Sequence, residues 1–178
     1  MLHFLDQFNA VIGVLLVIAF LIVMYRLPGI MASLALLIYI LIDLFLLAVI
    51  PGVQLTLPGI AGIVLSIGMA VDANVIIFER TKEELRAGKT VRASVESGFK
   101  RAFSAILDSN ITTIIAGVVL MIFGAGTIKG FAITLTIGVV CSMFTAVVVT
   151  RFLLRQMVGL NLTNHRLYGV RDAKEGNA

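Results

Sequence analysis

The sequence predicts an all-α membrane protein, a polytopic bundle of five transmembrane helices. Of its 178 residues, 60% are hydrophobic and only 13% are charged, and the mean hydropathy is +1.07. A soluble globular domain has about 25% charged residues. The apolar residues also fall into five runs, each close to the roughly 20 residues that a helix needs to cross a bilayer. The net charge of +4 is small, so we predict no nucleic-acid partner.

We expect one transmembrane domain over residues 1–160, followed by a disordered cytoplasmic tail over residues 161–178. Prolines fall at edges of the proposed spans, where a helix tolerates them and its interior does not. The expected spans are residues 7–25, 27–50, 57–78, 102–123 and 130–150.

Residues 79–101 form the only long polar loop between the spans. We expect the third span to continue as a helix to Arg86, where Gly88 can end it. Thr90 can cap a second helix, whose apolar side chains recur at helical spacing from Val91 to Phe103. This pattern predicts an amphipathic helix that lies on the inner membrane surface.

The distribution of basic residues predicts the orientation. Thirteen of the fourteen lysines and arginines follow the first, third or fifth span, and only Lys129 lies on the opposite side. Because cytoplasmic loops carry the excess of lysine and arginine, we expect the N-terminus outside and the C-terminus in the cytoplasm. Such a start suggests that a first span and an external domain are missing upstream.

Two aspartates lie inside spans, where an ionisable residue marks a functional site by default. Asp72 precedes Glu79 by seven residues, and Asp108 follows Arg101 by seven. Both carboxylates should therefore lie about 10 Å inside the cytoplasmic edge. We predict that the third and fourth spans are neighbours and that the two acids face a shared polar cavity. Two such carboxylates could relay protons; the alternative is that they only fix helix packing.

Small residues on the third span predict close helix packing on another face. That face and the polar residues of the spans lead to two sets of expected positions. The packing set is Gly59, Gly62, Ser66 and Ala70, together with Gly68 on the side of Asp72, and the set that supports the acids is Asn74, Ser109, Asn110, Thr112 and Thr113. For Ser109 and Thr113, a hydrogen bond back to their own helix is an equally good interpretation.

A similar small stripe on the fifth span, Thr134, Gly138, Cys141 and Thr145, also indicates helix packing. Asp43, in the outer half of the second span, has no polar neighbour at helical spacing. It faces either the bundle interior or an absent partner.

Other chemistry finds little support in the residues. One cysteine and two distant histidines predict no disulfide, no metal site and no cofactor. The GKT at residues 88–90 lacks the earlier glycine of a phosphate-binding loop, because that position is Glu83. We do not expect an enzyme.

Three stretches together resemble one family. They are YRLPG before the second span, LPGIAGIVLSIGMAVDANVIIFERTKEELRAGKT across the third, and FKRAFSAILDSNITT at the start of the fourth. These stretches resemble SecD, a bacterial protein-export membrane subunit of the RND superfamily, over about residues 10–160. The VDANV and LDSNITT motifs are the specific part of the likeness.

The resemblance implies five helices of one RND-type half without its first helix, in a bacterial inner membrane. It implies a SecF-like partner half, the SecYEG channel and a translocating protein substrate as partners, in contact with membrane lipid. It also implies that the proton gradient powers export, with Asp72 and Asp108 at the family's acidic positions. Asp43 departs from the family, where an uncharged residue is expected. Two alternatives are half of a small-molecule RND exporter, and an inactive fragment that serves as a scaffold.

Overall fold

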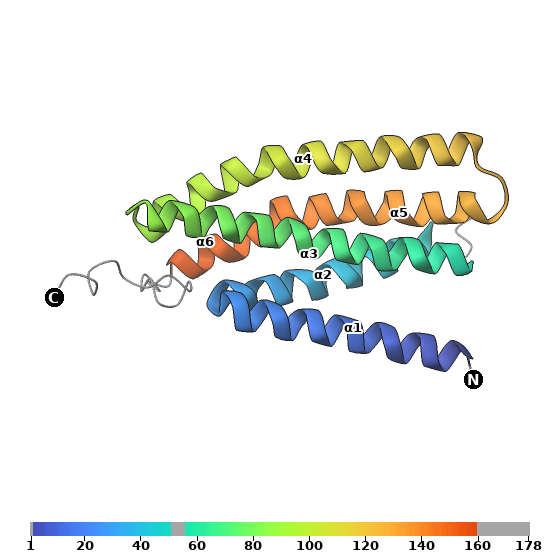
Figure 1. The fold of residues 1–178 in the computed structure, drawn as a ribbon, viewed down its shortest axis with the longest axis horizontal. Helices are drawn as coiled ribbons and strands as arrows, with labels where there is room; N and C mark the ends of the chain where they lie inside the picture. Colours follow the sequence, from blue (N-terminus) through green and yellow to red (C-terminus); the bar gives the residue numbers. More distant parts are fainter. Residues whose placement is uncertain (1, 51–55, 160–178) are drawn as a thin grey trace.

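The computed structural model describes residues 2–50 and 56–159, with side chains from Ile12 to Ile50 and from Thr56 to Gln156. All the secondary structure in these residues is helical. Five long helices lie along one another, and the last continues through a π-helical turn into a short sixth helix (Figure 1). The elements are α1 Leu2–Tyr25, α2 Leu27–Val49, α3 Leu57–Arg86, α4 Val91–Phe123, α5 Thr127–Phe144, η1 Thr145–Thr150 and α6 Arg151–Gly159.

Local sequence signals set the helix starts. The Thr56 hydroxyl accepts a hydrogen bond from the Gly59 amide at 3.2 Å, and Pro58 occupies the first turn of α3. Thr90 caps α4 in the same way, through the amide of Ala93 at 3.4 Å. Each hydroxyl satisfies an amide that has no partner within its helix. The caps therefore fix where α3 and α4 begin.

The polar loop confirms one expectation and corrects another. The α3 helix does run on to Arg86, as expected, and Gly88 follows with φ 84°, a backbone conformation that suits glycine. However, the helix that begins at Val91 does not lie separately on the membrane surface. It is continuous with the fourth span as one 33-residue helix. Its apolar residues Val91, Val95 and Phe99 are buried in the core of the bundle instead.

Among the residues with described side chains, four helices are long and apolar enough to cross a membrane: α2, α3, α4 and the continuous run Thr127–Gln156. In α1, the residues with described side chains form a shorter apolar helix, Ile12–Tyr25. The predicted span 7–25 therefore lies partly outside the described side chains, as the predicted tail 161–178 lies outside the described residues.

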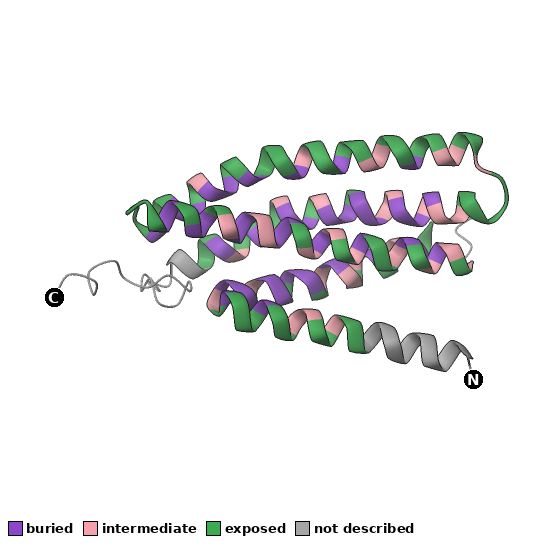
Figure 2. Cartoon of the chain, in the orientation of Figure 1, coloured by how far each residue is buried: buried purple, intermediate pink, exposed green. Residues whose placement is uncertain are grey.

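The core lies between α3 and the α5 run. In their most apolar stretches, half of the Thr127–Gln156 run is buried, against 33% of α3 and 17% of α4. Figure 2 shows this contrast between the α5 and α4 ribbons. The α3 helix contacts all four of the other long helices, which places it at the centre of the bundle. Large apolar side chains such as Leu41 and Phe123 are exposed on the outside, as expected of a surface that meets lipid or another chain.

The ends of the bundle separate the basic residues. Arg26, the α3–α4 turn and α6 lie at one end, and the α4–α5 loop that precedes Lys129 lies at the other, with the N-terminus (Figure 1). The charge asymmetry that the sequence predicts is thus an asymmetry of the folded chain.

Candidate functional site

The two acids of the predicted relay lie on neighbouring helices, since α3 packs against α4. Both Asp72 and Asp108 are exposed. Each sits on the side of its helix turned away from the buried residues. On α3 the buried face passes through Ala70, Ala73 and Asn74, and Asp72 lies between them in sequence but points out.

The prediction that both carboxylates face a shared cavity is therefore wrong for this chain alone. Small residues let α3 pack closely on α5, so the interior face of α3 is the small-residue face and not the face that carries Asp72. A polar cavity that contains Asp72 and Asp108 requires a surface from another chain.

The small-residue face of α3 is where the sequence places it, with one exception. Gly59, Gly62, Ser66 and Ala70 are all buried. A side chain at Gly62 would collide with Thr134 of α5, and the Thr134 hydroxyl donates to the Gly59 carbonyl at 3.0 Å. The exception is Gly68, which is exposed and has open space around it, so it packs against no described helix of this chain.

The matching stripe on α5 and the start of η1 is confirmed as a packing surface. Thr134, Gly138, Cys141 and Thr145 are all buried. A side chain at Gly138 would collide with Ser66 of α3. Glycine on one helix and serine on the other thus allow the two backbones to approach closely.

Asn74 links the acid-bearing helix α3 to the π-helical turn η1 that follows α5. Its side-chain oxygen accepts a hydrogen bond from Thr150 at 2.8 Å, and its amide donates to the Ala70 carbonyl at 3.2 Å. Asn74 and Thr150 are 3% and 0% exposed, so this is a fully buried polar link. Thr150 ends the π-helical turn η1, an irregularity often found at functional sites. The sequence singled out Asn74 but gave no reason to select Thr150.

The polar residues beside Asp108 divide into two groups. Thr112 and Thr113 donate to the carbonyls of Asp108 and Ser109, at 2.9 and 3.1 Å. Thr113 therefore follows the alternative in which the hydroxyl bonds back to its own helix. Ser109 is exposed, whereas Asn110 is buried at 4% exposure. Only Asn110 of this group faces the bundle core.

Of the two alternatives for Asp43, the bundle interior or an absent partner, the structure supports the interior, because the residue is only 1% exposed. Near it, the Tyr39 hydroxyl donates to Ser66 at 2.8 Å, and Ser66 donates to the Ile63 carbonyl at 2.8 Å. The thiol of Cys141 points at the Tyr39 carbonyl oxygen, 3.9 Å away. Sequence reasoning missed Tyr39. Its position four residues before Asp43, on the same helix face, was the available signal.

At the basic end, Glu84 joins α3 to α4. Its carboxylate is buried, at 3% exposure, and forms ion pairs with Lys89 and with Arg101, the latter at 2.8 Å. The hydrogen bond from Lys89, with the positive charge of Arg101, lowers the pKa of Glu84 below its ordinary value. The pair of cations holds the α3–α4 turn against the start of α4.

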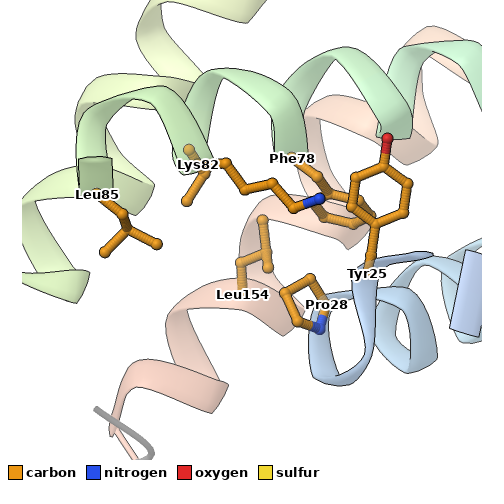
Figure 3. Close-up of a pocket in the computed structure, with 7 residues that line it drawn as sticks. Tyr25, Pro28, Phe78, Lys82, Leu85 and Leu154 are labelled. Carbon is orange, nitrogen blue, oxygen red and sulfur yellow. The ribbon is translucent and has the colours of Figure 1, made fainter. Parts of the chain in front are cut away.

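A small pocket opens at the same end, between α1, α2, α3 and α6 (Figure 3). Lys82 extends across it, with its ammonium nitrogen 4.2 Å from the centre of the Tyr25 ring. The same nitrogen pairs with Glu79 at 3.3 Å. The remaining lining is mostly apolar, and it consists of Pro28, Phe78, Thr81, Leu85 and Leu154. The lysine is therefore already satisfied by contacts within the chain.

No group of three or more potential metal ligands occurs among the residues with described side chains. The chemistry that the arrangement offers is proton binding by carboxylates: two on the exposed faces of α3 and α4, and one inside the bundle.

Comparisons with known proteins agree on one family. Residues 4–159 match the family model described as protein export membrane protein SecD/SecF, C-terminal. The chain is 58% identical over 156 residues to the protein translocase subunit SecD of Acidaminococcus fermentans, covering 86% of this chain and 37% of that protein. It is 60% identical over 147 residues to SecD of Synechocystis, covering 83% and 31%. The chain thus spans about a third of the length of these relatives.

A solved structure supports the same assignment. The chain superimposes on the crystal structure of SecDF, a translocon-associated membrane protein from Thermus thermophilus, with a TM-score of 0.81 and 43% identity. The match covers 85% of this chain and 21% of that one. The chain therefore belongs to the SecD/SecF family of protein-export membrane proteins, and it corresponds to the membrane portion of SecD.

Proposed function

We propose that this chain is a membrane part of a Sec protein-export subunit that couples the proton gradient to the translocation of exported proteins. The observation that carries the proposal is the family membership, together with two acids on the exposed faces of adjacent apolar helices. A carboxylate in a membrane span is costly unless it serves a function.

In this proposal, Asp72 is the main proton carrier and Asp108 tunes it. A SecF-like half covers the exposed faces of α3 and α4, and the two halves together enclose the cavity that this chain lacks. Covering Asp72 removes it from water, which favours the neutral acid. A conformational change that rehydrates it, or brings a cation from the partner half near it, releases the proton.

The buried link between Asn74 and Thr150 supports such a coupling. Asn74 lies two residues after Asp72 on the opposite face of α3, and it holds the π-helical turn before α6. A shift of α3 that accompanies proton binding would therefore pull on the end of the α5 run. This connection gives the proton site a mechanical route across the bundle.

The surrounding assignments are part of the same proposal. The protein sits in a bacterial inner membrane, with its N-terminus outside and its C-terminus in the cytoplasm. It works beside the SecYEG channel on a translocating protein substrate. A small-molecule exporter half is not favoured, because every relative named above is a SecD protein or the SecDF membrane protein. An inert scaffold of the same family predicts instead that Asp72→Asn has no effect on export.

The test is Asp72→Asn in the reconstituted complete complex. Asparagine keeps the shape of the side chain but cannot titrate. We expect the variant to fold and insert, and to lose the dependence of export on the proton gradient. Asp108→Asn should weaken that dependence less.

A matched control is Glu83→Gln, which removes an exposed carboxylate outside the proposed sites and should leave export unchanged. If Asp72→Asn still speeds export under a gradient as the wild type does, Asp72 is a packing residue and the proton-carrier role is wrong. A change in drug sensitivity with normal export would instead support the small-molecule exporter.

A further inference from the structure

Asp43 is an acid that the proposed mechanism does not use. It lies on α2 and is 1% exposed, whereas the two other span acids, Asp72 and Asp108, are exposed. Its Oδ1 atom is buried and accepts no hydrogen bond. Among the described side chains it is thus a carboxyl group without a visible partner, inside the most apolar part of the fold.

The groups around Asp43 cannot neutralise a negative charge. The titratable groups that face it are Tyr39 on its own helix and Cys141 on α5. The Tyr39 proton is committed to Ser66, at 2.8 Å, and Cys141 points at a carbonyl oxygen. The ion pairs among the described residues all involve other acids, at the basic end of the bundle.

An ionised carboxylate in such surroundings is very costly, and a buried acid without a cation or donors takes up a proton instead. We propose that Asp43 is a proton-binding site, whose carboxyl group holds a proton while α2 is packed on α3 and α5. Release transfers that proton to water and leaves the carboxylate, so it requires water to reach the group. Separation of α2 from Ser66 and Cys141 would admit that water.

The position of Asp43 gives the site its shortest route to solvent. Asp43 precedes the end of α2 at Val49 by six residues, which is about 9 Å along the helix. The opposite end of α2, at Leu27, is about 24 Å away by the same rise. The proton therefore exchanges through the end of the bundle that carries the N-terminus. This site is separate from Asp72 and Asp108, and its proton occupancy does not depend on their role.

Infrared spectroscopy of the intact protein in lipid vesicles tests the proposal. The background carries Asp72→Asn and Asp108→Asn, so that neither exposed span acid contributes. At neutral pH we expect the absorption band of a protonated carboxyl group, which shifts only slowly when the vesicles are moved into D2O. The band should be absent when Asp43→Asn is added. If the band is missing, or persists in the variant with Asp43→Asn, Asp43 does not hold the proton and the proposal is overturned.

The pH dependence of stability is an independent test. It compares the wild type with the single variant Asp43→Asn, and both proteins keep Asp72 and Asp108. If native Asp43 is protonated, the folded chain binds one proton more than the unfolded chain at pH values above about 4. The unfolding equilibrium constant of the wild type, relative to that of Asp43→Asn, should then rise about tenfold per pH unit, from the ordinary aspartate pKa of about 4 up to the pH at which the folded carboxyl group releases its proton. If this ratio of the two unfolding equilibrium constants is constant between about pH 5 and about pH 8, the proposal is contradicted. Neither readout uses export activity, so the failure of this inference is distinguishable from failure of the proposed function.

Discussion

At the scale of single residues, charge is placed where the fold can compensate it. Glu84 is as buried as many core residues, yet it lies between Lys89 and Arg101. Asp43 is equally buried and has no such partner among the described side chains. The two acids therefore have opposite expected states, ionised for Glu84 and protonated for Asp43, and they differ in the surroundings rather than in depth.

The first prediction concerns Glu84. Because its folded pKa is lowered, its stabilising contribution is present above the ordinary glutamate pKa of about 4.3 and is lost as the pH falls further. At neutral pH, Glu84→Gln should lower Tm by several degrees, since it leaves two cations facing an uncharged side chain. As the pH falls well below 4, by the same reference value, the variant and the wild type should converge.

Glu83→Gln is the matched control, because Glu83 pairs with Arg80 while both side chains are about half exposed. An exposed pair contributes about 1 kcal/mol or less, so Tm should barely change. Thermal unfolding in detergent at several pH values measures both variants. Equal Tm values for the two variants at neutral pH would show that Glu84 does not hold the turn.

How far the sequence predicts single residues follows from the physics. Packing residues on α3 were predictable, because small residues at helical spacing have one main use in a membrane. The exposure of Asp72 was not predictable, because helical periodicity alone does not say which face of a helix packs against its own chain. The partner of Asn74 was also unpredictable: Thr150 lies 76 residues away, and no local pattern links the two.

At the scale of elements, helix continuity is the feature that sequence reasoning missed. A polar, amphipathic stretch before the fourth span suggested a separate surface helix. In the structure, α4 runs unbroken from Val91 because α3 also extends beyond its apolar part, to Arg86. The two extensions bury their apolar faces against each other, so neither needs the membrane surface.

The second prediction tests that contact. A side chain at Gly98 of α4 would lie 2.7 Å from the backbone of Thr81 on α3. Backbone atoms cannot move aside like a flexible side chain, so Gly98→Ala should force the extensions apart. We expect a loss of about 1–3 kcal/mol, which exceeds the gain of about 1 kcal/mol that alanine brings to a helix.

The control for this variant is Gly13→Ala on α1, where the added carbon meets no atom within 4 Å. It should leave stability unchanged or raise it slightly. Unfolding titrations in mixed micelles compare the two. A Gly98→Ala protein as stable as Gly13→Ala would mean that the α3 and α4 extensions are not in close contact.

At the scale of the whole molecule, the orientation prediction can be tested with single cysteines. Ala87 is exposed in the α3–α4 turn and has φ −74°, so it accepts a cysteine better than Gly88 with its positive φ. The native Cys141 is buried and should not react. We expect Ala87→Cys to react with a membrane-impermeant thiol reagent only from the cytoplasm, since basic loops stay inside.

Lys129→Cys, exposed at the opposite end of the bundle, is the complementary probe and should react only from outside. Labelling of intact cells and of inverted vesicles distinguishes the two sides. Reaction of Ala87→Cys in intact cells would reverse the proposed topology, and with it the side from which each acid is reached.

The last prediction concerns the face that this chain leaves uncovered. Gly68 is exposed, has open space around it, and lies one helical turn before Asp72 on the same side of α3. A glycine there costs helix stability of about 1 kcal/mol relative to alanine, and it packs against no described helix of this chain. It is explained if another helix approaches α3 at that point, which is where the proposed SecF-like half must cover Asp72.

Gly68→Trp should therefore leave the chain folded but weaken its association with the partner half, because the ring would occupy the space that the partner needs. Leu41→Trp places the same ring on α2, at a side chain that is 73% exposed, and should leave association intact. Co-purification in mild detergent measures both variants, with thermal unfolding of the isolated chain as the check on folding. If Gly68→Trp co-purifies with the partner as well as Leu41→Trp does, the exposed face of α3 is not the interface, and the cavity around Asp72 must be closed in another way.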